Sequence, residues 1–227
     1  MNLLAFDTST ETLSIAVAAG GSTAQQLKQP GGARASAELI PAIQRLLAEA
    51  GLALAQLDAI VFGRGPGSFT GLRTACAVAQ GLAFGADVPV LPVDTLLAVA
   101  EDARASAGCE KVVALLDARM DEVYGASYEL RAGIWHEERA PWLGRPEDVQ
   151  APAGWVLAGN AALVYGARLP SAPVVPALPT AGALLRLAPA LLAAGQAVPA
   201  AHALPLYLRD KVAQTTQERA AAKRQTA

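Results

Sequence analysis

The chain has 227 residues, 53% of them hydrophobic, and its 18 basic and 20 acidic residues give a formal net charge of −2. This length allows one large or two small domains, and the scattered, balanced charge argues against a protein that binds nucleic acid unaided, because such proteins carry a basic patch. The two cysteines, Cys76 and Cys109, do not form a CxxC pair, so we expect both thiols to be reduced. The sequence shows neither a signal peptide nor an apolar run long enough to span a membrane, so we expect a cytoplasmic protein.

The first 105 residues alternate between short apolar runs and longer segments with helical periodicity, which is typical of an α/β lobe. The first strand ends at Asp7, and Gly20-Gly21 indicates a hairpin turn. Gly51 follows the first helical segment as a C-terminal cap. The expected strands are 3–6, 13–19, 23–28, 59–62 and 88–93, and the expected helices are 36–50, 72–84 and 95–105.

The pattern starts again in the second half of the chain. A strand at 112–116 ends at Asp117, as the first strand ends at Asp7, and further strands are expected at 122–129 and 134–139. The repeat predicts a pseudo-duplicated chain with one lobe at 1–105 and a related lobe at 106–209. Two unrelated β-meanders within one α/β protein are the alternative.

The remainder of the second half is rich in Ala and Pro and is harder to interpret. Residues 180–194 favour a helix that is interrupted at Pro189. Residues 210–227 are polar and charged, and we expect them to form a tail that is either a frayed helix or disordered.

A glycine-rich run, GRGPGSFTGLR at residues 63–73, separates an expected strand from an expected helix. Free N–H groups at a helix N-terminus often bind phosphate. A P-loop would need Lys and then Ser or Thr after its last glycine, but Gly67 is followed by Ser68 and Phe69. A dinucleotide fingerprint starting at Gly65 would need Gly or Ala where Thr70 stands. The run is therefore distinctive without matching either common phosphate motif.

Three motifs in this order resemble the TsaB (YeaZ) family: LLAFDTSTETLSIAV at 3–17, GRGPGSFTGLR at 63–73 and LLDARMDEVYGASYE at 115–129. The resemblance extends to about residue 209. It implies an α/β fold with two lobes, the pseudo-duplicated RNase H-like fold of actin, Hsp70 and the sugar kinases.

The resemblance also implies a function. Members of the family are non-catalytic partners that activate a TsaD-type enzyme, which attaches the threonylcarbamoyl group to adenosine in tRNAs. The implied partners are this catalytic paralogue, a TsaE-type ATPase, tRNA through the complex only, and a second copy of the chain when it is alone. No cofactor of its own is expected, and ATP or ADP at the subunit interface is an open option. The alternatives are a catalytically active ATPase or phosphotransferase of the same superfamily, and a glycoprotease.

A phosphotransferase of this fold would turn its first Asp turn and its glycine-rich loop towards a nucleotide. The residues of such a degenerate phosphate site would be Asp7, Thr8, Ser9, Gly65, Gly67 and Ser68. We favour the structural alternative, in which Asp7 caps the hairpin through its own backbone. In that interpretation Gly65 and Gly67 supply backbone angles that other residues resist, and Ser68 or Thr70 caps the following helix.

Neither a metal site nor a catalytic set is expected. In the TsaD-type relative two histidines four residues apart bind the metal, and the matching positions here are Thr95 and Val99. Valine cannot bind a metal, and threonine is a poor ligand for the metals that imidazole favours. The two histidines of the chain, His136 and His202, have no His or Cys at ligand spacing.

Two of the expected helices carry more apolar surface than one lobe needs. Helix 72–84 is apolar nearly all round, and helix 36–50 contains an interior proline, Pro41, at a cost of about 3 kcal/mol. Such departures from local rules tend to mark functional sites, so we expect a partner to dock here; the alternative is that the two helices cover each other. The expected interface residues are Leu39, Ile40, Ile43, Leu46, Leu47, Arg73, Cys76, Ala79 and Gln80.

Overall fold

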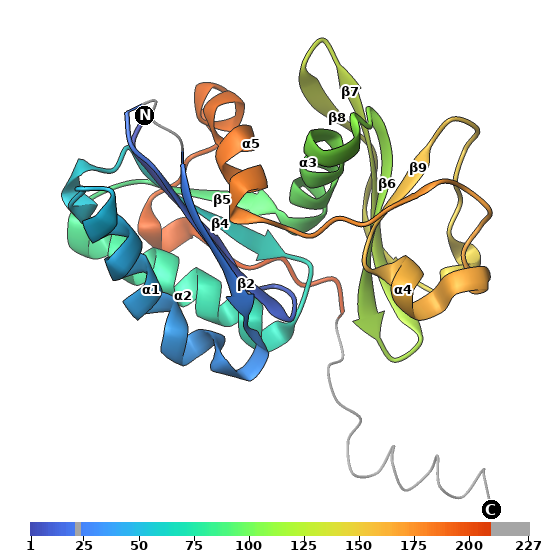
Figure 1. The fold of residues 1–227 in the computed structure, drawn as a ribbon, viewed down its shortest axis with the longest axis horizontal. Helices are drawn as coiled ribbons and strands as arrows, with labels where there is room; N and C mark the ends of the chain where they lie inside the picture. The colour runs from blue at the N-terminus through green and yellow to red at the C-terminus, as the bar shows by residue number, and fades with distance from the viewer. Residues whose placement is uncertain (21–23, 210–227) are drawn as a thin grey trace, which may run out of the picture.

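The computed structural model describes residues 1–20 and 24–209, and it contains two lobes, each built on a five-stranded sheet (Figure 1). The expectations for Gly21, Thr23 and the tail 210–227 lie outside the described residues. The first sheet contains β1 (Leu3–Asp7), β2 (Thr12–Ala18), β3 (Gln25–Pro30), β4 (Ala59–Gly65) and β5 (Val90–Asp94). The second contains β6 (Lys111–Arg119), β7 (Glu122–Arg131), β8 (Ile134–Gly144), β9 (Val156–Gly159) and β10 (Val174–Val175). The helices are α1 (Ala35–Glu49), α2 (Phe69–Ala86), α3 (Thr95–Ala107), α4 (Ala161–Tyr165) and α5 (Ala181–Ala193).

The two sheets have the same topology. The strand order is β3-β2-β1-β4-β5 in the first sheet and β8-β7-β6-β9-β10 in the second. In each sheet the first three strands of the chain pair antiparallel, and the next two join by parallel pairing. The matching order confirms the predicted pseudo-duplicated α/β fold and explains why an Asp ends the first strand of each copy.

Helices cover both faces of the first sheet, as expected for a sheet with parallel strands at its centre. All five residues of β1 are buried. One face of the sheet packs against α1 and α2, and the other against α5 (Figure 1). The first contact brings together Leu4, Phe6, Leu39, Ile43, Ala75 and Ala79, and the second brings together Leu3, Ala5, Leu184 and Leu187.

The C-terminal part of the chain returns to the first lobe, which corrects the expected boundary of a second lobe at 106–209. Besides α5, Val198 pairs with Val90 of β5 through backbone bonds of 2.9 and 2.8 Å. The short 3-10 helix Ala200–His202 then packs on α2. The physical reason is that the first sheet has a second apolar face, and this returning segment covers it.

Both interior prolines are accommodated in continuous helices. Pro189 does not interrupt α5, which corrects that expectation, and Pro41 lies inside α1. Each proline is exposed, so the carbonyl group that loses its helical donor can bind water instead. Within the described ranges, no helix combines the length and the apolar character that a bilayer crossing needs.

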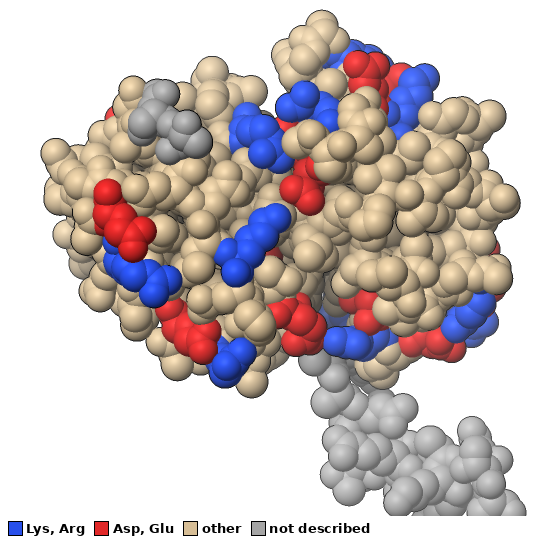
Figure 2. Space-filling view, viewed as in Figure 1, with Lys and Arg blue, Asp and Glu red and all other residues tan. Residues whose placement is uncertain are grey.

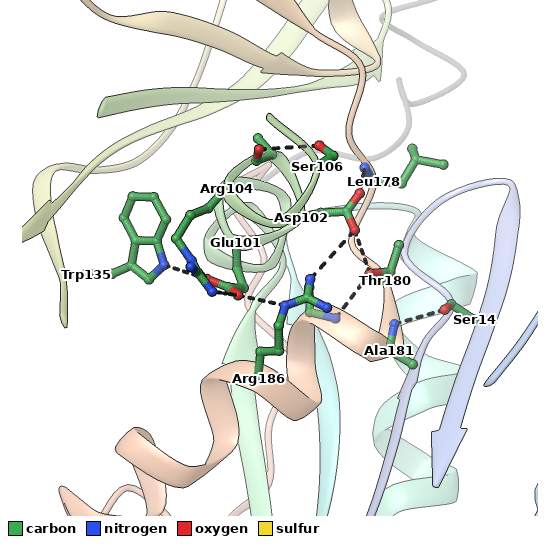
Figure 3. A network of polar contacts seen from close by, with 12 residues as sticks. Ser14, Glu101, Asp102, Arg104, Ser106, Trp135, Leu178, Thr180, Ala181 and Arg186 are labelled. Carbon is green, nitrogen blue, oxygen red and sulfur yellow. Dashed lines mark hydrogen bonds and ion pairs between the residues drawn. The ribbon is translucent and has the colours of Figure 1, made fainter. Parts of the chain in front are cut away.

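A buried carboxylate on α3 connects the two lobes (Figure 3). Glu101 is 2% exposed and accepts hydrogen bonds from Arg104 of its own helix at 2.8 and 2.7 Å. It also accepts one from Arg186 of α5 at 2.7 Å and one from the indole of Trp135 on β8 at 3.0 Å. Burial alone would raise the pKa of Glu101, but these hydrogen bonds hold that pKa below its usual range. The carboxylate thus joins a helix of the first lobe to a strand of the second.

The Glu101→Gln variant should lower the free energy of unfolding by about 3 kcal/mol at pH 7, because it removes one partner of a buried ion pair. We expect the low end of the usual range, since both arginine heads reach water. The loss should shrink as the pH falls below the usual Glu pKa, where the unfolded chain takes up the proton, and it should disappear below the lowered pKa of the folded carboxylate. Glu49→Gln is the control, because its pair with Arg45 is exposed and 3.9 Å long; it should change stability by less than about 0.5 kcal/mol. Equal losses in urea unfolding of the two variants would contradict this account.

Candidate functional site

The glycine-rich loop between β4 and α2 packs directly on the Asp7 turn that follows β1. A Cβ atom on Gly63 would lie 1.8 Å from Asp7 Oδ2, and one on Gly71 would lie 1.9 Å from the carbonyl oxygen of Thr8. The Thr8 hydroxyl donates a hydrogen bond of 2.7 Å to the Gly71 carbonyl. Only glycine leaves room for so close an approach of backbone to backbone. The loop and the turn therefore form one structural unit, called here the elbow.

Ser68 begins α2 at the elbow. Its hydroxyl oxygen accepts a hydrogen bond from the backbone N–H of Gly71 at 3.4 Å, which confirms one of the two predicted caps. Its own N–H donates to the carbonyl of Ser9 at 2.8 Å. The helix N-terminus is thus fixed to the Asp7 turn by backbone bonds.

Asp7 lies at the centre of the elbow and is fully buried. Its Oδ1 accepts hydrogen bonds from the backbone N–H and the hydroxyl of Ser9, at 2.9 and 2.7 Å. Its Oδ2 has no hydrogen-bond partner in the described part of the chain. Burial raises the pKa of Asp7 to about 7, although the two bonds from Ser9 act in the opposite direction. Asp7 therefore caps its own turn, in line with the structural interpretation.

A cavity of about 300 Å³ lies between the lobes. Three of the six candidate phosphate-site residues line it, namely Ser9, Gly67 and Ser68, together with Phe69 and the segment 206–209. The other three, Asp7, Thr8 and Gly65, are buried in the elbow. The structure therefore does not gather the six candidates around one ligand position, because the elbow uses half of them for its own packing.

The second Asp turn faces the cavity from the other lobe, and its carboxylate is also engaged. Asp117 Oδ1 accepts hydrogen bonds of 2.8 Å from the Tyr165 hydroxyl and from the backbone N–H of Arg119. Asp117 Oδ2 lies 3.3 Å from the Arg119 guanidinium. The backbone N–H of Asp117 donates to Asn160 at 2.9 Å. Both carboxylate oxygens of Asp117 therefore have partners within the chain.

The positions that match the histidines of the TsaD-type enzyme are closed. Thr95 and Val99 are both 0% exposed. The Thr95 hydroxyl accepts a hydrogen bond of 3.0 Å from the backbone N–H of Gly65. Within residues 1–20 and 24–209 no three His, Cys, Asp or Glu side chains are grouped to hold a metal ion.

Most of the expected interface residues face inwards, which corrects the expected set. Six of the nine belong to the hydrophobic core of the first lobe and are at most 6% exposed: Leu39, Ile43, Leu46, Leu47, Cys76 and Ala79. They cannot contact a partner while the lobe stays folded. Ile40 and Arg73 are exposed and Gln80 is partly exposed, so these three remain candidates. The physical reason is that the apolar stripe of each helix packs on the sheet and on the other helix.

The outward face of α2 is a stripe of exposed residues at helical spacing, Arg73, Ala77, Gly81 and Phe84. The Phe84 side chain is 85% exposed, and Ile40 on the neighbouring helix α1 is 40% exposed. Both helices lie on the outer side of the first lobe (Figure 1). Phe84 is not among the expected interface residues, although the helical spacing from Arg73 through Ala77 and Gly81 leads to it.

The fold and the cleft define a class of protein, a two-lobed and pseudo-duplicated α/β protein whose Asp turns are held by internal bonds. The family model for "TsaD: tRNA N6-adenosine threonylcarbamoyltransferase" matches residues 21–153. The chain is 36% identical over 226 residues to "tRNA threonylcarbamoyladenosine biosynthesis protein TsaB" of Escherichia coli K12, covering 94% of this chain and 96% of that protein.

Two further matches support the same family. The protein of the same name from Haemophilus influenzae is 48% identical over 124 residues, which are 55% of this chain and 52% of that protein. The solved structure of "YeaZ from Pseudomonas aeruginosa" superposes with a TM-score of 0.86 at 43% identity, covering 91% of this chain and 99% of that one. The chain belongs to the TsaB (YeaZ) family.

Gly71→Ala should lower the free energy of unfolding by about 1–3 kcal/mol, because its methyl group would collide with the Thr8 carbonyl, a backbone atom that cannot turn away. Gly81→Ala is the matched control in the same helix, since a Cβ there meets nothing within 4 Å. It should raise stability by up to about 1 kcal/mol. Chemical unfolding at one pH measures the free energy of unfolding of both variants. If Gly71→Ala left that free energy unchanged, the close packing described for the elbow would be wrong.

Asp7→Asn tests the buried carboxyl. The folded pKa of about 7 lies above the usual 3.8, so the proton on Asp7 stabilises the fold. This contribution is complete below about pH 4 and is lost as the pH rises to about 7. Relative to the Asn variant, which does not titrate, the wild type should lose free energy of unfolding between pH 5 and pH 7.5. A difference that stays constant in urea titrations at the two pH values would contradict the raised pKa.

Proposed function

We propose that the chain is a non-catalytic subunit that binds and activates a TsaD-type catalytic paralogue in threonylcarbamoyladenosine formation on tRNA. Its named relatives are tRNA threonylcarbamoyladenosine biosynthesis proteins, which supports the pathway. The observation that carries the non-catalytic role is the engagement of both Asp turns in internal bonds. A catalytic group must reach the reacting atoms, but Asp7 is fully buried and Asp117 is paired with Arg119.

The surface that supports a partner role is the outward face of α1 and α2. The Phe84 side chain is 85% exposed on α2, and Ile40 adds a second exposed apolar side chain on the neighbouring helix. Aromatic residues are enriched where protein partners bind. We propose that the TsaD-type paralogue docks on this face, and that a second copy of the chain uses it when the paralogue is absent.

The charge distribution supports contact with tRNA through the complex only. Lys and Arg side chains are interspersed with Asp and Glu across the face in Figure 2, and the net charge is −2. Tight binding of tRNA would require a continuous basic surface, so we propose that other subunits supply it. In the same proposal the complex works in the cytoplasm with a TsaE-type ATPase, and ATP or ADP binds between subunits rather than to this chain alone.

Phe84→Asp should weaken binding to the TsaD-type paralogue by at least about tenfold, because a charge would be buried at the contact. Leu163→Asp is the matched control, since Leu163 is 83% exposed but lies on α4 in the other lobe. It should bind as the wild type does. Both variants should keep the wild-type melting temperature to within about 2 °C, since neither side chain packs in a core. Titration calorimetry with the purified paralogue measures the dissociation constant of each variant. Equal dissociation constants for the two variants would place the interface elsewhere.

The rival function needs its own measurement. An ATPase or phosphotransferase would turn over ATP as a purified chain, whereas a non-catalytic subunit would raise turnover only when mixed with the paralogue. Turnover by the isolated wild type that is lost in Asp117→Asn would support the rival.

A further inference from the structure

Residues 203–209, called here the strap, run from the first lobe to the second without regular secondary structure (Figure 1). The strap begins against α2. The Ala203 carbonyl is buried and accepts hydrogen bonds from the Gln80 amide at 2.8 Å and from the Cys76 thiol at 3.2 Å. Next, the Leu206 N–H donates to the Arg64 carbonyl at 2.7 Å, just before the elbow.

Tyr207 joins the strap to the first turn of α2. Its ring lies 5.4 Å from the ring of Phe69, and its hydroxyl accepts a hydrogen bond of 3.2 Å from Arg73. The Arg73 guanidinium in turn lies 4.0 Å above the Phe69 ring. Tyr207 is nevertheless 42% exposed, and Arg73 belongs to the outward stripe of α2. This end of the strap is therefore accessible at the surface where we place the partner.

Arg209 joins the strap to the other lobe. Its guanidinium donates to the carbonyl of Ala118 at 3.0 Å and to the carboxylate of Glu122 at 2.6 Å. A longer contact of 3.4 Å reaches the carbonyl of Arg119. The Arg209 side chain is only 15% exposed, so these contacts are shielded from water. These contacts fall on the last residues of β6 and the first residue of β7, on either side of the turn.

That turn adopts a backbone that its sequence does not favour. Three consecutive residues other than glycine have left-handed angles, Arg119 with φ 60°, Met120 with φ 56° and Asp121 with φ 65°. Side chains make this region unfavourable, but the two-residue hairpin loop between the paired residues Arg119 and Glu122 favours it at Met120 and Asp121. Arg168 contacts Asp121, and Arg209 adds contacts on both sides of the loop, so removing Arg209 should loosen the turn.

We propose that the strap couples the outward surface of α2 to the conformation of the β6–β7 turn at the mouth of the interlobe cavity. A partner that contacts Arg73 and Tyr207 displaces or tightens the strap, and Arg209 transmits this change to the turn. The turn and the strap both line the cavity, so its shape responds to docking. The coupling is a property of the isolated chain; only the identity of the partner rests on the proposed function.

Hydrogen exchange of the isolated full chain tests the coupling, with the peptide that covers residues 117–123 as readout. Arg209→Ala should raise its exchange about tenfold, and the milder Arg209→Lys should raise it by less, since lysine keeps the charge without the planar fork. Tyr207→Ala changes the strap at its other end and should still raise exchange in this peptide about threefold. Leu204→Ser is the matched control, because Leu204 is 64% exposed within the strap, and it should change exchange by less than about twofold.

The proposal is overturned if Tyr207→Ala leaves exchange in residues 117–123 at the wild-type rate, since Arg209 would then be a local contact only. It is also overturned if neither Arg209 variant changes that rate. A second arm adds the TsaD-type paralogue, which should alter exchange in the same peptide. If Phe84→Asp abolishes binding but the bound paralogue leaves the turn unchanged, the coupling fails while the proposed function stands. If Phe84→Asp still binds, the proposed docking face fails while the experiment on the isolated chain still decides the coupling.

Discussion

The close contact between the glycine-rich loop and the Asp7 turn is the constraint on which the first lobe depends. Gly71 lies against the Thr8 carbonyl and Gly63 against the Asp7 carboxyl, with no room for a side chain at either position. This contact fixes where α2 begins and hence which face of α2 meets the sheet. It also uses the backbone groups that a phosphate-binding turn would offer to a ligand. The contacts that stabilise the elbow therefore leave fewer backbone groups available to bind a ligand.

The two lobes are held together by a second device, the exchange of their last helices. The final helix of the first copy, α3, packs on the second sheet, and the final helix of the second copy, α5, packs on the first. Glu101 lies where they meet and bonds to both Arg186 and Trp135. A buried ionic group is weak evidence for stability. Here its geometric effect is clear, because three donors from three elements converge on one carboxylate and define how the lobes are oriented.

The sequence was sufficient for the strands of both copies and for the duplication, because hydrophobic periodicity and the repeated strand–Asp pattern are local features. It was not sufficient for the surfaces. Helix α2 is apolar nearly all round, so periodicity could not distinguish buried Ala79 from exposed Ala77, and the exposed Phe84 was overlooked. The return of α5 to the first sheet depends on long-range packing that no local pattern encodes. Asp7 was correctly interpreted as a cap, since an Asp after a strand commonly bonds to its own turn, but its burial came from glycines 56 and 64 residues further on.

These features together fit the role of a partner subunit that we propose for the chain. Binding costs less when the contacting surface is already ordered. The elbow orders the start of α2, so on the docking face that we propose only the strap would change when a partner binds. Replacing Thr95 and Val99 by histidine would not by itself create a metal site. Both positions are 0% exposed, so imidazole rings there would have no space. The packing at the elbow therefore both buries Asp7 and orders the start of the helix on which we propose that the partner docks.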